Sequence, residues 1–292
     1  MPRIGAHMSI AGGLPLAIDR AVAHGCETLQ IFSKSSNQWR ARALADTEIA
    51  EFRARVAATG IRPVLAHASY LINLASVEPR LRARSIASFG EEIDRAEALG
   101  LLGVVLHPGA YTTGTQEAGL ASIAAAVAGL LRARPRGRTM VLLEHTAGQG
   151  TSLGHSFEQL ADLLRRLRWN KRVGICLDTC HLYAAGYDIA SVDGYRATFE
   201  QFDRLVGIDR LKAFHLNDSK KACGSRVDRH EHIGDGTLGL EPFHRLLHDP
   251  RLAAVPMVLE TPKSDDRIRG ALETDPLDMR NLQTLRDLRD RS

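Results

Sequence analysis

The sequence predicts a single α/β domain, a closed barrel in which eight parallel strands alternate with helices. Three observations lead to this fold class. Short apolar runs rich in Val, Ile and Leu alternate along the 292 residues with longer segments of helical periodicity. There are eight such runs. No Pro/Ser-rich linker, low-complexity segment or shift in composition marks a domain boundary within residues 1–292.

The eight predicted strands are the apolar runs themselves. In chain order they cover residues 3–8 (RIGAHM), 27–32 (ETLQIF), 62–67 (RPVLAH), 103–108 (GVVLHP), 139–144 (TMVLLE), 172–178 (RVGICLD), 210–216 (RLKAFHL) and 255–260 (VPMVLE). Eight βα units in one domain are typical of a (β/α)8 TIM barrel. A doubly wound open sheet is the structural alternative.

Helices are predicted between these strands, and the clearest cover residues 46–60, 78–100, 116–134 and 156–168. Several end at or just before a glycine, as helix C-termini often do. Two glycine-containing loops, 147–155 and 217–239, are longer than average connections, which favours binding loops over linkers.

Composition restricts the functional class. The formal net charge is only +4, although the sequence pI of about 9.0 shows that base exceeds acid. This balance is compatible with a nucleic-acid partner without requiring one. The N-terminal MPRIGAHMSI lacks the apolar core of a signal peptide, and no apolar run approaches the roughly 18 residues of a membrane span. We therefore expect a cytoplasmic protein with no membrane partner.

The four cysteines, Cys26, Cys176, Cys180 and Cys223, form no C-x-x-C pair and are too few to staple a chain of this size. They are expected to be reduced and mostly buried.

The position of the acidic and imidazole side chains is the main functional signal. Six predicted strands carry a histidine or a carboxylate as their last or next-to-last residue, namely His67, His107, Glu144, Asp178, His215 and Glu260. In a parallel barrel these ends meet at one face, where barrel active sites are built. Six such groups crowded together without a cation would suffer desolvation and like-charge repulsion. The pattern therefore predicts a metal cluster at the C-terminal face of the strands.

Two loops add three further candidate ligands. LDTCH places His181 three residues after Asp178, and VDRH places Asp228 and His230 two residues apart, on the same side of an extended segment. The nine candidates suit two or three ions, and a nitrogen and oxygen set without thiolate favours zinc, with manganese or iron as alternatives. Such an open cluster can hydrolyse a phosphodiester. His7 is a further residue that can reach the pocket, whereas Glu231 and His232 are expected in supporting or solvent-facing positions.

The chain resembles the endonuclease IV family of apurinic/apyrimidinic endonucleases over nearly its whole length. The matching blocks are IGAHMSIAGGL, HASYLINLA, LHPG, EHTAGQG, DTCHLYAAGYD, HLNDSK, GSRVDRHEHIGDG and LETP. The resemblance implies three zinc ions and cleavage of duplex DNA 5′ to an abasic site, leaving a 3′-hydroxyl and a 5′-deoxyribose phosphate. It also implies removal of 3′-blocking groups, with hydroxide between two of the ions as the nucleophile.

The resemblance assigns roles residue by residue. It implies that His67, His107 and Glu144 hold one zinc. It implies that Glu144 bridges to a second zinc held by Asp178, His215 and Glu260. His181, Asp228 and His230 would then hold the third ion, and the carboxylates Glu144, Asp178 and Glu260 would act in catalysis through the metal-bound hydroxide.

For DNA, the resemblance implies that Tyr70 and Leu71 insert near the lesion. The predicted backbone contacts are Lys34, Asn37, Gln38, Trp39, Arg40, Arg226 and Arg229. The chain departs from the family at three positions. Asn37 stands where an arginine is frequent, Ala68 where an aspartate is common, and His145 where an asparagine is usual. Strand alternation predicts that His145 faces away from Glu144.

Two other functions compete with this interpretation. Related barrels that isomerise or epimerise sugars use metal sites on the same face, but they usually need one or two ions. A DNA-binding protein that keeps metal only for structure is the other alternative. We expect a monomeric enzyme that acts on DNA in the cytoplasm, associated with the nucleoid.

Overall fold

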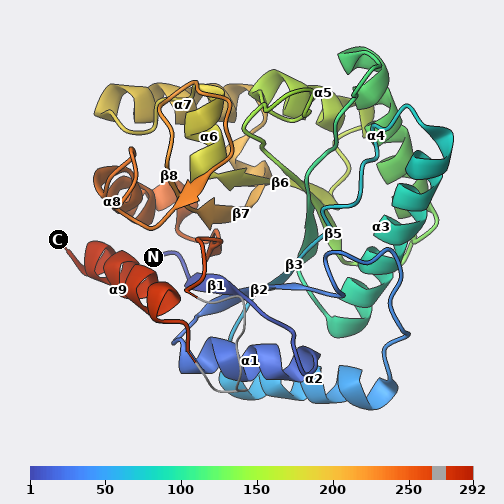
Figure 1. Cartoon of the computed structure of the whole chain (residues 1–292), viewed down its shortest axis with the longest axis horizontal. Helices are drawn as coiled ribbons and strands as arrows, with labels where there is room; N and C mark the ends of the chain where they lie inside the picture. The colour runs from blue at the N-terminus through green and yellow to red at the C-terminus, as the bar shows by residue number, and fades with distance from the viewer. Residues whose placement is uncertain (265–273, 292) are drawn as a thin grey trace.

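The structure is a computed structural model that describes residues 1–264 and 274–291, and it confirms the closed barrel. Eight parallel strands pair in the order β1-β10-β7-β6-β5-β4-β3-β2, and β2 pairs in turn with β1 (Figure 1). They are β1 (Ile4–Met8), β2 (Thr28–Phe32), β3 (Val64–His67), β4 (Gly103–Leu106), β5 (Met140–Glu144), β6 (Val173–Asp178), β7 (Leu211–Leu216) and β10 (Met257–Leu259). Each strand lies within its predicted run. The doubly wound alternative is excluded because the sheet closes on itself.

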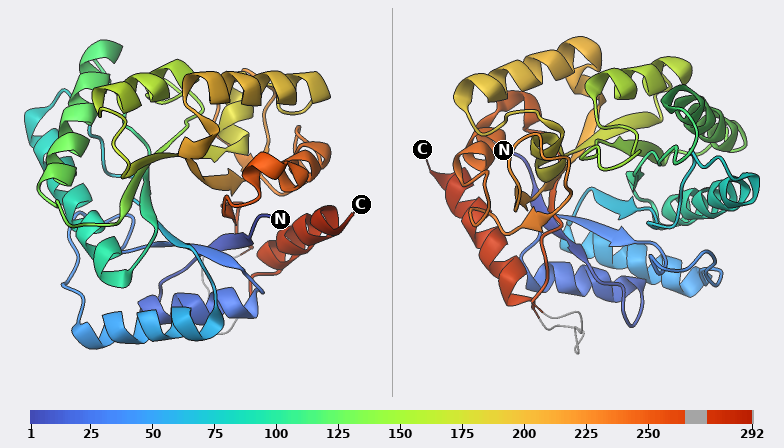
Figure 2. Two further views of the ribbon diagram at one scale, coloured as in Figure 1. Left: turned by 180° about the vertical axis from the view of Figure 1, so that it is seen from behind. Right: turned by 45° about the horizontal axis from the view of Figure 1, so that its top comes forward.

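Helices surround the barrel on the outside (Figures 1 and 2). They are α1 (Leu14–Ala23), α2 (Asp46–Thr59), α3 (Pro79–Leu99), α4 (Gln116–Arg132), α5 (Phe157–Arg166), α6 (Thr179–Ala185), α7 (Val192–Leu205), α8 (Glu241–His248) and α9 (Pro276–Asp290), with short 3-10 turns at Ile208–Arg210 and Pro250–Leu252. The four predicted helices agree with α2 to α5 within two residues. Helices α2 and α3 end at Gly60 and Gly100, both left-handed, as the sequence predicts.

The apolar core has two layers. A large cluster fills the space between the outer face of the strands and the helices. A small cluster fills the barrel interior and consists of Leu65, Val105, Leu142, Cys176, Ala213 and Val258. Each interior residue precedes one of the six strand-end candidates by two positions. Because residues i and i+2 of a strand point to the same face, the barrel plug lies directly beneath the candidate ligands.

The long loop 217–239 carries secondary structure that the sequence does not predict. A two-stranded antiparallel ribbon joins β8 (Asp218–Ser219) to β9 (His230–Glu231). The ribbon fixes the second half of the loop over the barrel mouth. It therefore sets the position of the charged segment that contains Asp228 and His230.

The cysteines agree with the prediction: all four are free, and three of them are buried. Within residues 1–264 and 274–291, no helix is both long enough and apolar enough to span a membrane.

Candidate metal centre

The six strand-end candidates converge on the barrel axis. β3, β5 and β6 end at His67, Glu144 and Asp178, while His107 and Glu260 each follow their strand by one residue. The alternation that places the apolar plug inside the barrel also turns these side chains inward, one layer above it. Strand geometry therefore explains why these side chains share one direction, and no special loop conformation is needed.

Glu144 is the centre of the cluster. Its Oε2 lies 3.1 Å from His67 Nε2 and 3.0 Å from His107 Nε2. Its Oε1 lies 3.0 Å from Nδ1 of His215. The carboxylate is fully buried, and its two oxygens face two different groups of candidate ligands. A carboxylate whose oxygens are divided in this way could be shared between two cations.

The second group completes the other side of Glu144. Potential donor atoms of Glu144, Asp178, His215 and Glu260 all lie within 4.8 Å of one another. His215 Nδ1 is 3.1 Å from Oε2 of Glu260 and 3.9 Å from Oδ2 of Asp178. His7 also reaches this side, with Nδ1 3.3 Å from Oε1 of Glu260.

The third group lies between α6 and the ribbon. Asp228 offers one oxygen to each of two imidazoles, at 3.1 Å from His181 Nε2 and 3.3 Å from His230 Nε2. Asp178 Oδ2 is 3.7 Å from the same His230 nitrogen. The Cys180 thiol falls within the same 4.8 Å set as Asp228 and His230, and burial raises the pKa of the free thiol to about 12.

Most of the imidazoles are held from behind. The outer nitrogens of His67, His181 and His230 donate to the carbonyls of Ala68, His145 and Glu260, at 2.7, 2.9 and 3.1 Å. His215 donates from Nε2 to Oε1 of Gln30 at 2.9 Å. In each case the remaining nitrogen points at carboxylates. A histidine that ligates a metal shows this arrangement, because the outer hydrogen bond fixes the ring and its tautomer.

Two inward nitrogens support the fit to a cation. His181 Nε2 and His230 Nε2 are buried and make no hydrogen bond within the described residues, although Asp228 lies close to both. A divalent cation satisfies imidazole nitrogens and carboxylate oxygens together. Nitrogen and oxygen donors in this ratio are the ligands that zinc prefers in catalytic sites.

The charges of the cluster are strongly coupled. Burial opposes ionisation of Glu144, but His107 and His215 outweigh it and hold the pKa of the carboxyl well below its usual value. Burial alone would lower the pKa of His230. The carboxylates of Asp178 and Asp228 outweigh burial and raise this pKa to about 9. The pKa of His181 is likewise well above its usual value, chiefly because Asp178 outweighs burial. A cation must therefore displace protons from these rings, so its binding should strengthen as pH rises.

Three supporting residues are absent from the sequence-based prediction. Gln30 donates to Glu260 and accepts from His215. Asn217 donates to Asp178 at 2.6 Å and accepts from the backbone N–H of Glu260 at 3.0 Å. The available signal was a polar side chain within a buried strand: Gln30 lies in the otherwise apolar TLQIF.

The third supporting residue, Asp218, organises the ribbon loop. Its carboxylate accepts hydrogen bonds from the backbone N–H groups of Ser219, Gly234, Gly236 and Leu238 at 2.7 to 3.1 Å. A Cβ at Gly236 would lie 2.4 Å from Oδ1 of Asp218, so the loop requires glycine there. Glu231 and His232, which are expected in supporting or solvent-facing positions, contact residues outside the set of candidate ligands. Glu231 lies 3.7 Å from Lys220, and His232 lies 3.1 Å from the Asn281 amide.

The predicted direction of His145 is correct. Its ring packs between Phe157 and Tyr187, at centroid distances of 5.6 and 5.3 Å, on the opposite side of the strand from Glu144. Burial lowers the pKa of His145 to about 3. Its effect on the site therefore passes through its carbonyl, which holds His181. Ala68 likewise acts through its carbonyl, which anchors His67.

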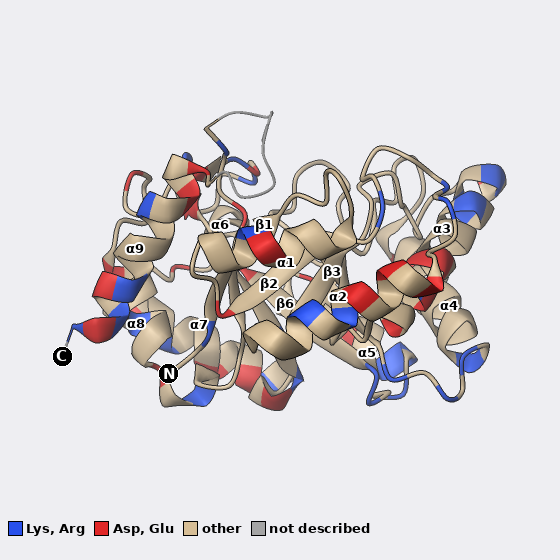
Figure 3. Cartoon of the chain, turned by 90° about the horizontal axis from the view of Figure 1, so that it is seen from below, with Lys and Arg blue, Asp and Glu red and all other residues tan. Residues whose placement is uncertain are grey.

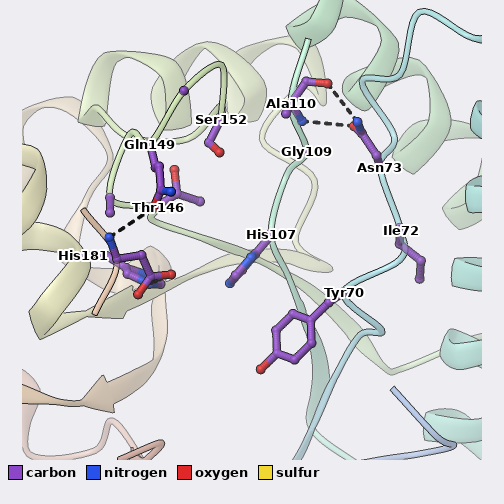
Figure 4. A pocket seen from close by; sticks show the side chains of 13 residues that line it. Tyr70, Ile72, Asn73, His107, Gly109, Ala110, Thr146, Gln149, Ser152 and His181 are labelled. Carbon is purple, nitrogen blue, oxygen red and sulfur yellow. Dashed lines mark hydrogen bonds and ion pairs between the residues drawn. The ribbon is translucent and has the colours of Figure 1, made fainter. Parts of the chain in front are cut away.

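A cavity of about 500 Å³ opens beside the cluster. Figure 4 shows Tyr70 and His107 on one side of it and His181 and Gln149 on the other. Tyr70 is 60% exposed and its ring lies 5.2 Å from that of His67, at the rim of the cluster. Leu71 follows it and is half-buried.

The other predicted DNA contacts differ in their exposure to solvent. Asn37, Gln38, Arg40, Arg226 and Arg229 are exposed. Trp39 is partly covered, with the Arg84 guanidinium 4.5 Å from its ring centroid. Lys34 requires a correction. It is buried, and its ammonium donates to the Trp39 carbonyl and the Ser88 hydroxyl at 2.8 and 2.7 Å, so it stabilises the loop and is not presented to DNA.

Comparison with known proteins identifies the family to which the chain belongs. The family described as "Xylose isomerase-like TIM barrel" matches residues 18–281. The "Probable endonuclease 4" of Trichlorobacter lovleyi is 51% identical over 98% of this chain and 99% of its own length. The protein of the same name from Chloroflexus aurantiacus is 50% identical, covering 99% of this chain and 98% of its own.

The chain belongs to the endonuclease IV family. The crystal structure of endonuclease IV from Thermus thermophilus superposes with a TM-score of 0.85 at 39% identity, covering 98% of each chain. A D-psicose 3-epimerase superposes with a TM-score of 0.70 at 15% identity, covering 98% of each chain. At that identity, the likeness to the epimerase shows a shared fold only.

Proposed function

We propose that this member of the endonuclease IV family is a zinc-dependent DNA repair endonuclease. It would hydrolyse the phosphodiester 5′ to an abasic site in duplex DNA, leaving a 3′-hydroxyl and a 5′-deoxyribose phosphate. It would also remove groups that block 3′ ends. Family membership supports DNA as the substrate, and the geometry of the cluster supports metal-assisted hydrolysis.

The observation that carries this proposal is the arrangement around Glu144. One buried carboxylate divides its oxygens between two groups of ligands, and the imidazoles around it are held by carbonyl or amide oxygens on their outer sides. Such a set would be costly to bury without cations. A multinuclear metal centre best explains why these carboxylates and imidazoles are buried together.

We assign three ions to the nine residues. His67, His107 and Glu144 would hold the first, and Glu144 would be shared with a second held by Asp178, His215 and Glu260. His181, Asp228 and His230 would hold the third. When bound, such ions lower the pKa of water and neutralise charge on a phosphodiester. Glu144, Asp178 and Glu260 would act in catalysis by keeping the ions in place and close together.

The side chains at the rim would bind and orient the DNA. Arg226 and Arg229 flank the Asp228 segment and are exposed, so they can pair with backbone phosphates. Tyr70 lies at the rim of the cluster beside the 500 Å³ cavity, where it can pack against the DNA duplex next to the lesion. An abasic nucleotide has no base to unstack, so rotating it toward the cluster costs less than flipping an intact nucleotide.

A single assay tests this function. A duplex carrying one tetrahydrofuran abasic analogue should be cut once, on its 5′ side, and a strong chelator should abolish the cut. Zinc added after removal of the chelator should restore it. The same duplex without the analogue is the control and should stay intact.

Two outcomes would reject the proposal. Absence of incision under metal-replete conditions, together with interconversion of a ketose and its epimer, would assign the centre to sugar chemistry. Tight binding of the abasic duplex without incision, unaffected by chelation, would indicate a DNA-binding protein with a structural metal.

The predicted monomeric state and cytoplasmic location remain predictions.

A further inference from the structure

A second strongly charged surface lies at the opposite end of the barrel from the metal centre. Residues 132–138 and 165–172 contain nine of the chain's 38 lysines and arginines and no acidic residue. These segments connect α4 to β5 and α5 to β6, and β5 and β6 are hydrogen-bonded neighbours. They therefore lie side by side at the N-terminal ends of the strands, where Figure 3 shows basic residues gathered below α4 and α5.

Only part of this charge is neutralised. Arg134 pairs with Asp94, and Arg165 and Arg166 pair with Asp162. Arg172 donates to the carbonyls of Arg134 and Thr139, so it ties the two segments together. Among the described residues, the following have exposed side chains with no acidic partner: Arg132, Arg136, Arg138, Arg168 and Lys171. We call these two segments and their side chains the basic surface.

The basic surface contains a hollow of about 550 Å³. Its lining combines apolar side chains, among them Leu131, Pro135 and Leu167, with polar ones, among them Arg132, Arg168 and Asn170. A cavity of this size can accept a group as large as a nucleotide. Apolar and cationic side chains in one hollow match the chemistry of a nucleobase with its phosphate.

An aromatic residue, Trp169, lies in the chain between Arg168 and Asn170, which both line the hollow. Trp169 is 40% exposed, and the Arg210 guanidinium lies 5.6 Å from its ring centroid. Arg168 and Trp169 both adopt left-handed backbone conformations, with φ of 52° and 51°. Helix C-termini usually place glycine in such a conformation. Here the chain retains a cation and an aromatic ring, the two side-chain types that bind single-stranded nucleic acid.

We propose that the basic surface is a second DNA-binding site, and that it binds a single-stranded segment. Phosphates would pair with Arg132 and Arg168, and an unpaired base would enter the hollow or stack on Trp169. A base within a duplex is not available for either contact. The metal centre lies at the other ends of the same strands, so the two sites would bind separate DNA segments. This inference does not depend on the proposed incision activity.

Binding of a fluorescently labelled 12-nucleotide oligothymidylate, measured by anisotropy over a salt series, tests this site. The double variant Arg132→Gln/Arg168→Gln should bind about tenfold more weakly at low salt. Its plot of log affinity against log salt should be shallower by about 1.4, the value for two lost phosphate contacts on a single strand. The variant Arg62→Gln/Arg204→Gln makes the same charge change at exposed arginines elsewhere and should resemble the wild type. Equal affinities for the two double variants would overturn the proposal.

A second measurement reports on the base. In a Trp39→Phe background, Trp169 is the remaining tryptophan, and its emission should be quenched by the oligothymidylate and not by a blunt duplex of the same length. Three results would overturn the proposal: no quenching, equal quenching by the duplex, or saturation by thymidine monophosphate at the same nucleotide concentration. The last would assign the hollow to a free nucleotide. Displacement of the DNA by an oligoglutamate of equal charge would assign the surface to an acidic protein and also contradict it.

Discussion

Glu144 shows how one buried side chain can define the site. Its two oxygens contact imidazoles from β3, from the segment after β4 and from β7, so it joins the two groups that we propose as ligands of two ions. A shorter or uncharged side chain could not serve both groups. At the scale of single residues, the account therefore rests first on this carboxylate.

Glu144→Gln keeps the shape of the side chain and removes its charge. Incision of the abasic duplex should fall by at least about a thousandfold, because several kcal/mol of stabilisation depends on the ions that Glu144 holds. Zinc content per chain should fall as well, while the far-UV circular dichroism stays that of the wild type. Glu200→Gln, at an exposed carboxylate on α7, is the matched control. Wild-type turnover in Glu144→Gln would refute the bridging role.

Gln30 tests the support behind the ligands. Gln30→Leu removes the acceptor for His215 and the donor to Glu260 in one step. Zinc affinity, measured by competition with a chromogenic chelator, should weaken by about 10- to 100-fold. Excess zinc should restore most of the activity, because the nine residues proposed to bind the ions directly are unchanged. A loss of activity with unchanged zinc affinity would contradict this role.

Single elements explain why neighbouring residues have opposite fates. At the end of β5 the alternation that turns Glu144 into the barrel turns the next residue, His145, outward, into a packed site between Phe157 and Tyr187. The backbone carbonyl of His145 accepts a hydrogen bond from His181. One strand thus contributes a ligand on one face, an apolar contact on the other and an anchor through its backbone.

The burial of His145 predicts a specific pH dependence of stability. Its pKa is about 3 in the folded protein and about 6.5 when unfolded, so the stability it contributes is present above pH 6.5 and is lost as pH falls toward 3. At pH 5 this loss is about 2 kcal/mol. The free energy of unfolding of His145→Phe, relative to that of the wild type, should therefore rise by about 2 kcal/mol when the pH is lowered from 8 to 5.

Urea unfolding of the metal-free proteins at the two pH values measures this change. The titration of the metal-site histidines is common to both proteins and cancels in the difference. A difference between His145→Phe and wild type that stays constant from pH 8 to pH 5 would show that His145 is accessible to protons in the folded state.

At the scale of the whole molecule, the barrel brings together residues as distant in sequence as His67 and Glu260. The sequence predicts the eight strands and the nine candidate ligands, because strand periodicity and side chains at strand ends are local patterns. It could not predict Gln30 or Asn217, whose role is visible only once β2, β6, β7 and β10 are placed around one axis. The burial of Lys34 is likewise a tertiary effect, since Ser88 belongs to α3, far along the chain.

The ends of the barrel also differ in a way that the sequence alone does not reveal. The arginine-rich segments 132–138 and 165–172 resemble a composition bias until the fold places them together around one hollow. The nine candidate metal ligands gather at the other end. The parallel arrangement of the strands thus places the proposed metal centre and the proposed second DNA-binding site at opposite ends of the barrel.

Anomalous X-ray diffraction at the zinc absorption edge, on crystals grown from zinc-replete protein, tests the central claim most directly. The account predicts three peaks at the barrel mouth. One should lie among His67, His107 and Glu144, one among Asp178, His215 and Glu260, and one among His181, Asp228 and His230. A map with no peak among these nine side chains, or with zinc bound only elsewhere on the protein, would contradict it.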